Sequence, residues 1–207
     1  MGEPVSGPWE QMLAGRGQAG GVIVGGPTPG PSGTTEVQAA GLVVVERVGL
    51  ADLDEVRSVR FRALQDAPEA FGSTLAREHG LSEVDWHRRL TTGAWWLARQ
   101  DGRVVGLVAG IHPEGTQTRE LVSMWVDPTA RGEGVADLLV GVVFDWARAE
   151  GAEAVTLWVV DGNRPAERLY QRVGFVPTGI RVDRPGDPPR IENQMMVRLA
   201  SGGQKVT

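Results

Sequence analysis

The sequence predicts a mixed α/β fold whose elements follow the order β-α-α-β-β-β-α-β-α-β-β. Three observations support this prediction. Short apolar runs typical of strands alternate with longer segments whose apolar residues recur at helical spacing. The dipeptide Asp101-Gly102, a strong short-range signal for a hairpin, separates two of the strand runs. The glycine-rich segment RGEGVA, residues 131–136, stands between a strand and a helix.

Composition separates an N-terminal segment from the rest of the 207 residues. Residues 1–41 are rich in Gly, Pro, Ser and Thr and poor in aromatic side chains. Such a segment cannot bury enough apolar surface to offset the entropy lost on ordering. We therefore expect a disordered tail at 1–41, a single domain at 42–200 and a short flexible C-terminus at 201–207.

The first half of the domain begins with the apolar run Leu42–Val48, which we expect to form a strand. Asp52 is a suitable N-cap for a helix that continues to about Ala67, and Ser82 is one for a second helix that contains Leu90. Further strands are then expected at Ala94–Arg99, Val104–Ile111 and Leu121–Val126.

The second half begins with a helix that we expect to run from Leu138 to about Glu150, where Gly151 stops it. Asn163 is a suitable N-cap for a short helix that Gly174 closes. The remaining strands are expected at Ala154–Val160, Phe175–Val182 and Gln194–Leu199.

Charge and composition argue against several classes of partner. A formal net charge of −5 does not favour nucleic acid or a membrane surface. No apolar run is long enough to span a bilayer, and the N-terminus has no signal-peptide core. The chain has no Cys, and no cluster of His, Asp and Glu has the spacing of a metal site. We therefore expect a cytoplasmic protein without a metal.

The glycine-rich loop has the features of an anion site. The first N–H groups of a helix lack partners within the helix, and the helix dipole places partial positive charge there. Gly132 and Gly134 allow a bulky anion to approach the backbone, and Arg131 adds a donor suited to phosphate. The sequence thus favours a bound pyrophosphate; a tight turn without a ligand is the alternative. Neither a P-loop nor a Gly-x-Gly-x-x-Gly dinucleotide motif is present.

The same loop resembles the Gln/Arg-x-x-Gly-x-Gly/Ala motif of the GNAT superfamily of acyl-CoA-dependent N-acyltransferases. About 30 residues after the loop the chain also resembles the second signature of that superfamily. The resemblance covers about Leu42–Leu199, and it implies the mixed-sheet fold of this superfamily. The residues that carry the second signature are Asn163, Ala166, Tyr170, Gly174 and Phe175.

The resemblance implies acetyl-CoA as cosubstrate, bound where the fourth and fifth strands part. Its pantetheine arm is expected on the main chain of Met124, Trp125 and Val126, with the Val126 amide polarising the thioester carbonyl. Trp125 is alternatively a core residue, and Asn163 serves the cofactor arm, the helix cap or both. The residues expected around the diphosphate are Arg131, Gly132, Glu133, Gly134, Val135 and Ala136.

Tyr170 and Glu120 are the expected catalytic residues. The resemblance places Tyr170 where it protonates the CoA sulfur; packing in the core is the alternative. A lysine-like amine of pKa about 10.4 is only about 0.04% neutral at pH 7, so a base is needed. A Glu of pKa about 4.3 is roughly 8 kcal/mol too weak, so burial must raise the pKa of Glu120 or water must relay the proton. An exposed strand-end carboxylate is the alternative for Glu120, and His112 is a further candidate base.

We therefore expect an N-acetyltransferase that moves the acetyl group of acetyl-CoA to a primary amine by direct attack. The resemblance implies that the acceptor enters between residues 66–78 and 181–190. The mixed charges of these segments fit a small molecule or a protein or peptide amine. A homodimer is left open. The alternative is a non-catalytic acyl-CoA-binding or regulatory module of the same fold.

Overall fold

The computed structural model describes residues 41–184 and 189–199, so the expected tail before Gly41 and the expected C-terminal segment lie outside the described residues. Seven strands form one mixed sheet in the order β1-β2-β3-β4-β5-β7-β6. The strands are β1 (Val43–Val48), β2 (Ala94–Gln100), β3 (Arg103–Ile111), β4 (Thr118–Val126), β5 (Ala154–Val160), β6 (Val176–Arg184) and β7 (Arg190–Arg198).

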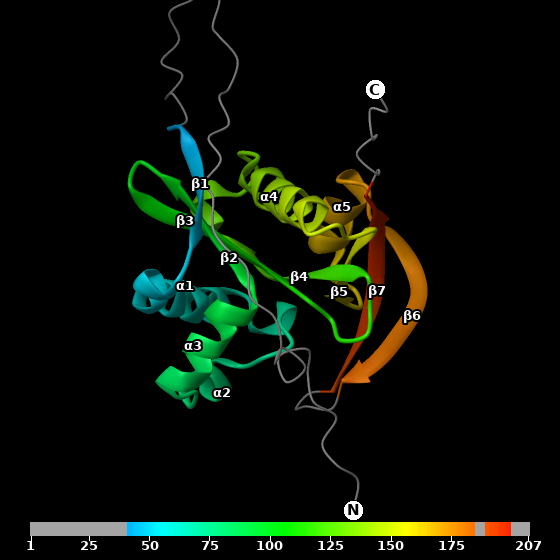
Figure 1. Cartoon of the computed structure of the whole chain (residues 1–207), viewed down its shortest axis with the longest axis horizontal. Coiled ribbons are helices and arrows are strands. Elements are labelled where there is room, and N and C mark those ends of the chain that lie inside the picture. Colours follow the sequence, from blue (N-terminus) through cyan, green and yellow to red (C-terminus); the bar gives the residue numbers. More distant parts are fainter. Residues whose placement is uncertain (1–40, 185–188, 200–207) are drawn as a thin grey trace, which may run out of the picture.

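Helices cover both faces of this sheet (Figure 1). On one face lie α1 (Leu53–Asp66), α2 (Leu75–His79) and α3 (Glu83–Thr92), and on the other lie α4 (Val135–Ala149) and α5 (Arg164–Arg172). Trp95 and Trp96, adjacent on β2, are both buried and belong to the cores on opposite faces, as the alternation of a strand predicts. Among the described helices none is long and apolar enough to cross a bilayer.

The predicted order of elements is confirmed, with differences at several boundaries. The hairpin between β2 and β3 turns at Asp101 and Gly102, both with positive φ. The helix α2 was not predicted, because five residues show no helical period; a hydrogen bond from the Arg77 amide to the Thr74 hydroxyl caps it. The helix α4 begins at Val135, directly after the glycine loop and three residues before the expected start.

Two strands begin earlier than their apolar runs indicate. The polar segment Thr118–Glu120 belongs to β4 because it pairs in parallel with the start of β5. The charged start of β7, including Glu192, pairs with both β5 and β6. In both cases hydrogen bonds to neighbouring strands, which local hydrophobicity does not report, set the boundary.

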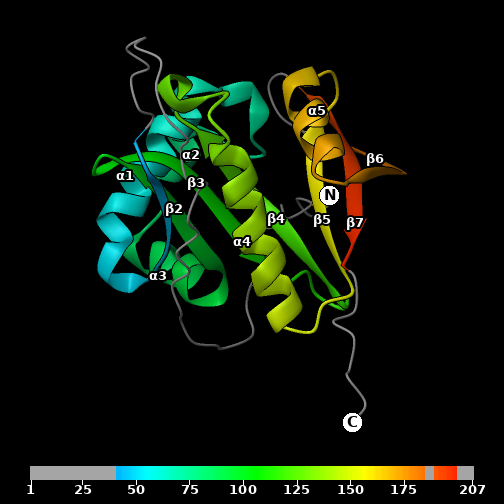
Figure 2. The same ribbon diagram turned by 90° about the horizontal axis from the view of Figure 1, so that it is seen from above.

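The central strands β4 and β5 part soon after they meet (Figure 2). Their pairing is confined to Thr118–Glu120 and Ala154–Thr156. Beyond it, the register between β3 and β4 shifts, and Ser123 takes a φ of 57°, which is unusual for a residue other than Gly. This is a β-bulge, which bends its strand and increases the local twist. The expected separation of the fourth and fifth strands is thus confirmed.

The packing of α4 on the sheet depends on a missing side chain in β3. A Cβ at Gly110 would overlap the indole ring of Trp146, whereas a Cβ at Gly141 within α4 would meet no atom within 4 Å. We expect Gly110→Ala to lower the free energy of unfolding by about 1–3 kcal/mol through overpacking. Gly141→Ala should raise it by about 0.5–1 kcal/mol, since Ala is the better helix former. Urea denaturation of both variants tests this, and equal effects would contradict the packing described.

Candidate active site

A cavity of about 720 Å³ opens where β4 and β5 part. Residues of β4, of the glycine loop, of the start of α4 and of α5 line it. Every residue expected to bind the cofactor lines it except Glu133, whose carboxylate instead accepts a hydrogen bond from Gln100 at 2.8 Å. The expected residues that do line it are Met124, Trp125, Val126, Arg131, Gly132, Gly134, Val135, Ala136, Asn163 and Tyr170.

The glycine loop presents bare backbone to this cavity. Gly132 and Gly134 have φ of 86° and 83°, in the left-handed region where side chains other than Gly are strained. A Cβ at either position would meet no protein atom within 4 Å, so the space above the loop is open. Gly134 is the N-cap of α4 and has no side chain to occupy the free N–H groups of the first turn. The loop therefore suits an anionic ligand group.

The Arg131 side chain is engaged by the protein itself. Its Nε donates to the Val126 carbonyl at 3.1 Å, and its Nη2 pairs with the carboxylate of Asp66 at the end of α1. Trp125 Nε1 donates to the same carboxylate at 2.9 Å. These bonds tie the loop to the end of β4 and to α1. The Arg131 Nε and Nη2 groups are therefore already engaged within the protein. An anion at the loop would meet the backbone amides first.

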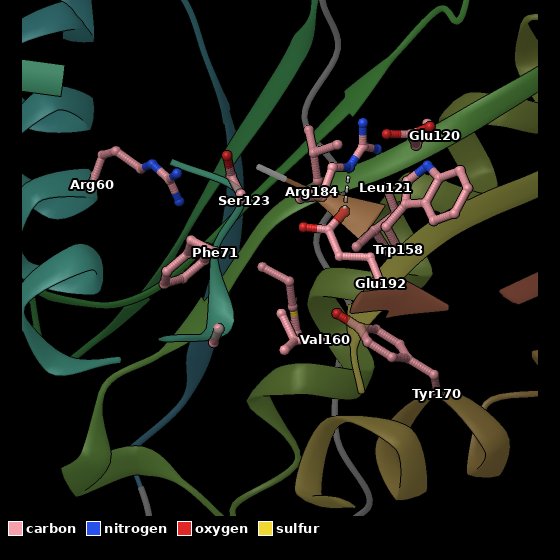
Figure 3. A pocket seen from close by; sticks show the side chains of 14 residues that line it. Arg60, Phe71, Glu120, Leu121, Ser123, Trp158, Val160, Tyr170, Arg184 and Glu192 are labelled. Atoms are coloured by element: carbon pink, nitrogen blue, oxygen red, sulfur yellow. Dashed lines mark hydrogen bonds and ion pairs between the residues drawn. The ribbon is translucent and has the colours of Figure 1, made fainter. Parts of the chain in front are cut away.

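Asn163 and Tyr170 reach the cavity from the α5 side. The Asn163 side chain accepts a hydrogen bond from the Ala166 amide at 3.3 Å and so caps α5. Tyr170 is 7% exposed and packs edge-on against Phe175. Figure 3 shows its hydroxyl pointing into the space between the strands. Burial raises the pKa of Tyr170 well above its ordinary value, so the hydroxyl keeps its proton.

A smaller cavity of about 110 Å³ adjoins the first (Figure 3). The two share lining residues, among them Phe71, Met124, Trp158 and Tyr170. The segments expected to border the acceptor both contribute, with Ala70, Phe71 and Gly72 from the first and Arg184 from the second. The other polar side chains in its wall are Arg60, Glu120, Ser123 and Glu192.

Glu120 is 6% exposed, so the alternative of an exposed carboxylate at the strand end is wrong. Burial raises its pKa to about 7, against the opposing effects of a hydrogen bond from Trp158 and the charge of Arg184. Nearby Glu192 raises it further. Glu120 Oε1 has no hydrogen-bond partner among the described residues. The carboxylate therefore changes protonation state near neutral pH inside the smaller cavity.

The histidines lie elsewhere. His112 lines neither cavity; its Nε2 is 3.5 Å from Glu150 Oε2, and its ring packs edge-on against Trp146. His79 stacks on Phe61. The geometry therefore favours Glu120 over His112 as a base.

Several cavity residues were not found from the sequence. Arg60 carried a usable signal, because it lies on the buried face of α1 together with Val56, Val59 and Ala63. A charged side chain at such a position is rare unless it is paired. Ser123, Trp158 and Glu192 carry no local signal, because the strand pairing and the bulge bring them together.

Comparison with known proteins identifies the class. Residues 59–175, more than half of the chain, match the acetyltransferase (GNAT) family. The chain therefore belongs to the GNAT acetyltransferase family, which consists of acyltransferase enzymes that use acetyl-CoA.

Named relatives match over part of their length. The chain is 33% identical over 132 residues to mycothiol acetyltransferase of Thermomonospora curvata, covering 63% of this chain and 43% of that protein. It is 36% identical over 91 residues to N-acetyltransferase family 8 member 2 of Rattus norvegicus, covering 42% and 40%. The matched regions thus span less than half of these two relatives.

Solved structures show the same fold. A GNAT-family acetyltransferase from Streptococcus pneumoniae superposes with a TM-score of 0.65 at 18% identity, covering 76% of this chain and 99% of that one. A protein from Salmonella typhimurium described as a possible acetyltransferase, solved with its cofactor acetyl-CoA, gives 0.60 at 17% identity, covering 80% and 98%. At these identities the likeness concerns the fold alone.

The buried Glu120 predicts a pH-dependent cost to stability. Because its pKa is about 7 in the folded state against 4.5 unperturbed, the folded state binds its proton more tightly, and stability falls as pH rises from about 4.5 to about 7. We expect the free energy of unfolding of Glu120→Gln at pH 8 to exceed that of the wild type by up to about 3 kcal/mol. This difference should vanish near pH 4.

Urea denaturation across this pH range measures the difference. The control is Glu114→Gln, at an exposed position, which should show no such pH dependence. A Glu120→Gln difference that stays constant with pH would contradict the burial of an ionisable carboxyl.

Proposed function

We propose that this protein transfers the acetyl group of acetyl-CoA to a primary amine by direct attack, without an acyl-enzyme. The observation that carries the proposal is that two cavities of unequal size share Tyr170 in their walls, with Glu120 in the wall of the smaller one. The larger cavity suits a long cofactor arm and its diphosphate, and the smaller one suits an acceptor amine. The relatives include proteins named as N-acetyltransferases, which supports nitrogen as the acceptor atom.

The larger cavity fits acetyl-CoA on its own features. The open backbone at Gly132 and Gly134 and the first turn of α4 would hold the diphosphate. The main chain of Met124–Val126 borders the cavity and would hold the pantetheine arm as an added strand does. When bound, acetyl-CoA supplies an acetyl thioester, and the Val126 amide is the proposed donor to its carbonyl oxygen.

Glu120 is the proposed base. An unperturbed Glu lies some six pKa units below a lysine-like amine, whereas a pKa of about 7 reduces the gap to roughly three and a half units, or about 5 kcal/mol. The unpartnered Oε1 of Glu120 takes the amine proton, directly or through water, as the nitrogen bonds to the acetyl carbon.

Tyr170 is the proposed acid. Its hydroxyl holds a proton at neutral pH, because burial raises its pKa, and it lines both cavities. As the carbon–sulfur bond breaks, the Tyr170 hydroxyl donates its proton to the departing thiolate. The nitrogen gives up its second proton to water as the amide forms, and water returns a proton to Tyr170. Glu120 and Tyr170 thus act on the two sides of the reacting carbon.

Thiol release from acetyl-CoA in the presence of an amine panel tests the proposal. We expect wild-type turnover to rise with pH through about 7 as Glu120 ionises, and Glu120→Gln to lose that rise. Tyr170→Phe and Glu120→Gln should each lower kcat by roughly 100-fold or more, with the KM for acetyl-CoA little changed. Glu114→Gln is the matched control and should behave as the wild type.

Two outcomes of this experiment would contradict the proposal, in whole or in part. If the protein binds CoA but no amine in a broad panel releases thiol, a non-catalytic acyl-CoA-binding module is the better description. If amines react but both variants are as fast as the wild type, the transfer stands and the assigned roles of Glu120 and Tyr170 fall.

A further inference from the structure

Arg60 brings a buried cation to the wall of the smaller cavity. It is 1% exposed, and its Nε and Nη2 donate to both carboxylate oxygens of Glu78 at 2.9–3.2 Å. Its Nη1 has no hydrogen-bond partner among the described residues. Figure 3 shows the guanidinium extending from α1 toward Ser123 on β4. Arg60 therefore offers one free donor edge at the cavity.

Ser123 supplies a second unmatched donor in the same wall. Its Oγ is buried and also has no hydrogen-bond partner among the described residues. The residue lies in the β4 bulge with a φ of 57°, a conformation that is strained for a residue with a side chain. Buried polar groups normally find a partner, so two such donors lining one cavity indicate that a ligand atom satisfies them.

Charge around the cavity points to the nature of that atom. Glu78 contacts the guanidinium groups of both Arg60 and Arg89, with Arg89 Nη1 at 3.2 Å, so Arg60 shares this carboxylate with a second cation. Glu192 is likewise shared by Arg184 at 3.0 Å and Arg190 at 3.4 Å. An anionic ligand group would suit the Arg60 guanidinium, because it shares its carboxylate and has one donor without a partner among the described residues.

We propose that the acceptor is an amine that also carries a carboxylate, with the carboxylate held by Arg60 Nη1 and Ser123 Oγ and the amine directed to Glu120. This inference rests on the acetyl transfer proposed above and narrows its substrate to small amino acids. The cavity volume of about 110 Å³ suits a ligand of that size. The groups of the ligand match those of the wall. Guanidinium and hydroxyl donors bind a carboxylate, and the carboxylate of Glu120 binds an amine.

The experiment compares amines that differ only in the carboxylate. Glycine, β-alanine and γ-aminobutyrate are paired with methylamine, ethylamine and propylamine, and each amino acid also with its primary amide. Binding to the CoA-loaded protein is measured by calorimetry, and acetylation by thiol release. At the favoured spacing we expect the amino acid to bind at least about tenfold tighter than both its amine and its amide.

Two variants locate the carboxylate. Ser123→Gly removes the hydroxyl and relieves the positive φ, so it should fold at least as well as the wild type. It should weaken binding of the favoured amino acid about tenfold and leave the matched amine within twofold. Arg60→Gln should weaken it about a hundredfold, with folding checked by thermal denaturation. Arg57→Gln, on an exposed part of the same helix, is the control.

The outcomes separate this inference from the function on which it rests. Amino acid, amine and amide that bind and react alike, or variants that lose all ligands equally, would overturn the carboxylate site and leave acetyl transfer standing. No binding of any of the three amino acids would also overturn it. Selective binding that depends on Ser123 and Arg60, with no thiol released, would support the site and count against acetyl transfer.

Discussion

The parting of β4 from β5 is the constraint on which the rest of the structure depends. The two strands share only three pairs of residues before they separate. The bulge at Ser123 bends β4 at that point, and the larger cavity occupies the gap. In an ordinary sheet these backbone groups would pair with the neighbouring strand. Here the main chain of β4 borders a cavity instead, so the edge is open to a ligand that can add to it.

The same separation explains the electrostatics of the site. Glu120 is the last β4 residue paired with β5, so it is held in the interior where the gap begins. Its low exposure raises its pKa to about 7, and the aromatic ring of Trp158 and the Arg184–Glu192 pair surround it. A functional carboxyl is thus positioned by strand pairing, while the cost of burying it falls on the stability of the fold.

Local signals in the sequence predicted the parts of the site that depend on local backbone. Some local backbone conformations favour only a few residue types. This holds for the glycines of the loop, the Asn163 cap and the Asp101-Gly102 hairpin. Ser123 and Glu192 could not be placed, because their roles come from neighbours distant in sequence. The sequence left the burial of Glu120 open for the same reason, because the residues before Leu121 give no sign of the parallel pairing with β5. Arg60 was missed although its position on the buried face of α1 was a signal.

The central claim is that a cofactor diphosphate binds the backbone amides of residues 132–136, which directs the reactive end of the cofactor toward Tyr170. The most direct measurement is an NMR titration of backbone amide signals with CoA. We expect the signals from residues 132–136 to shift strongly, while the signal of Gly115, in the turn before β4 and at the other end of that strand from the loop, does not shift. Gly134→Asp, which places a carboxylate in the loop, should abolish the shifts with the fold retained. Saturation with CoA that leaves the signals of residues 132–136 unmoved would contradict it.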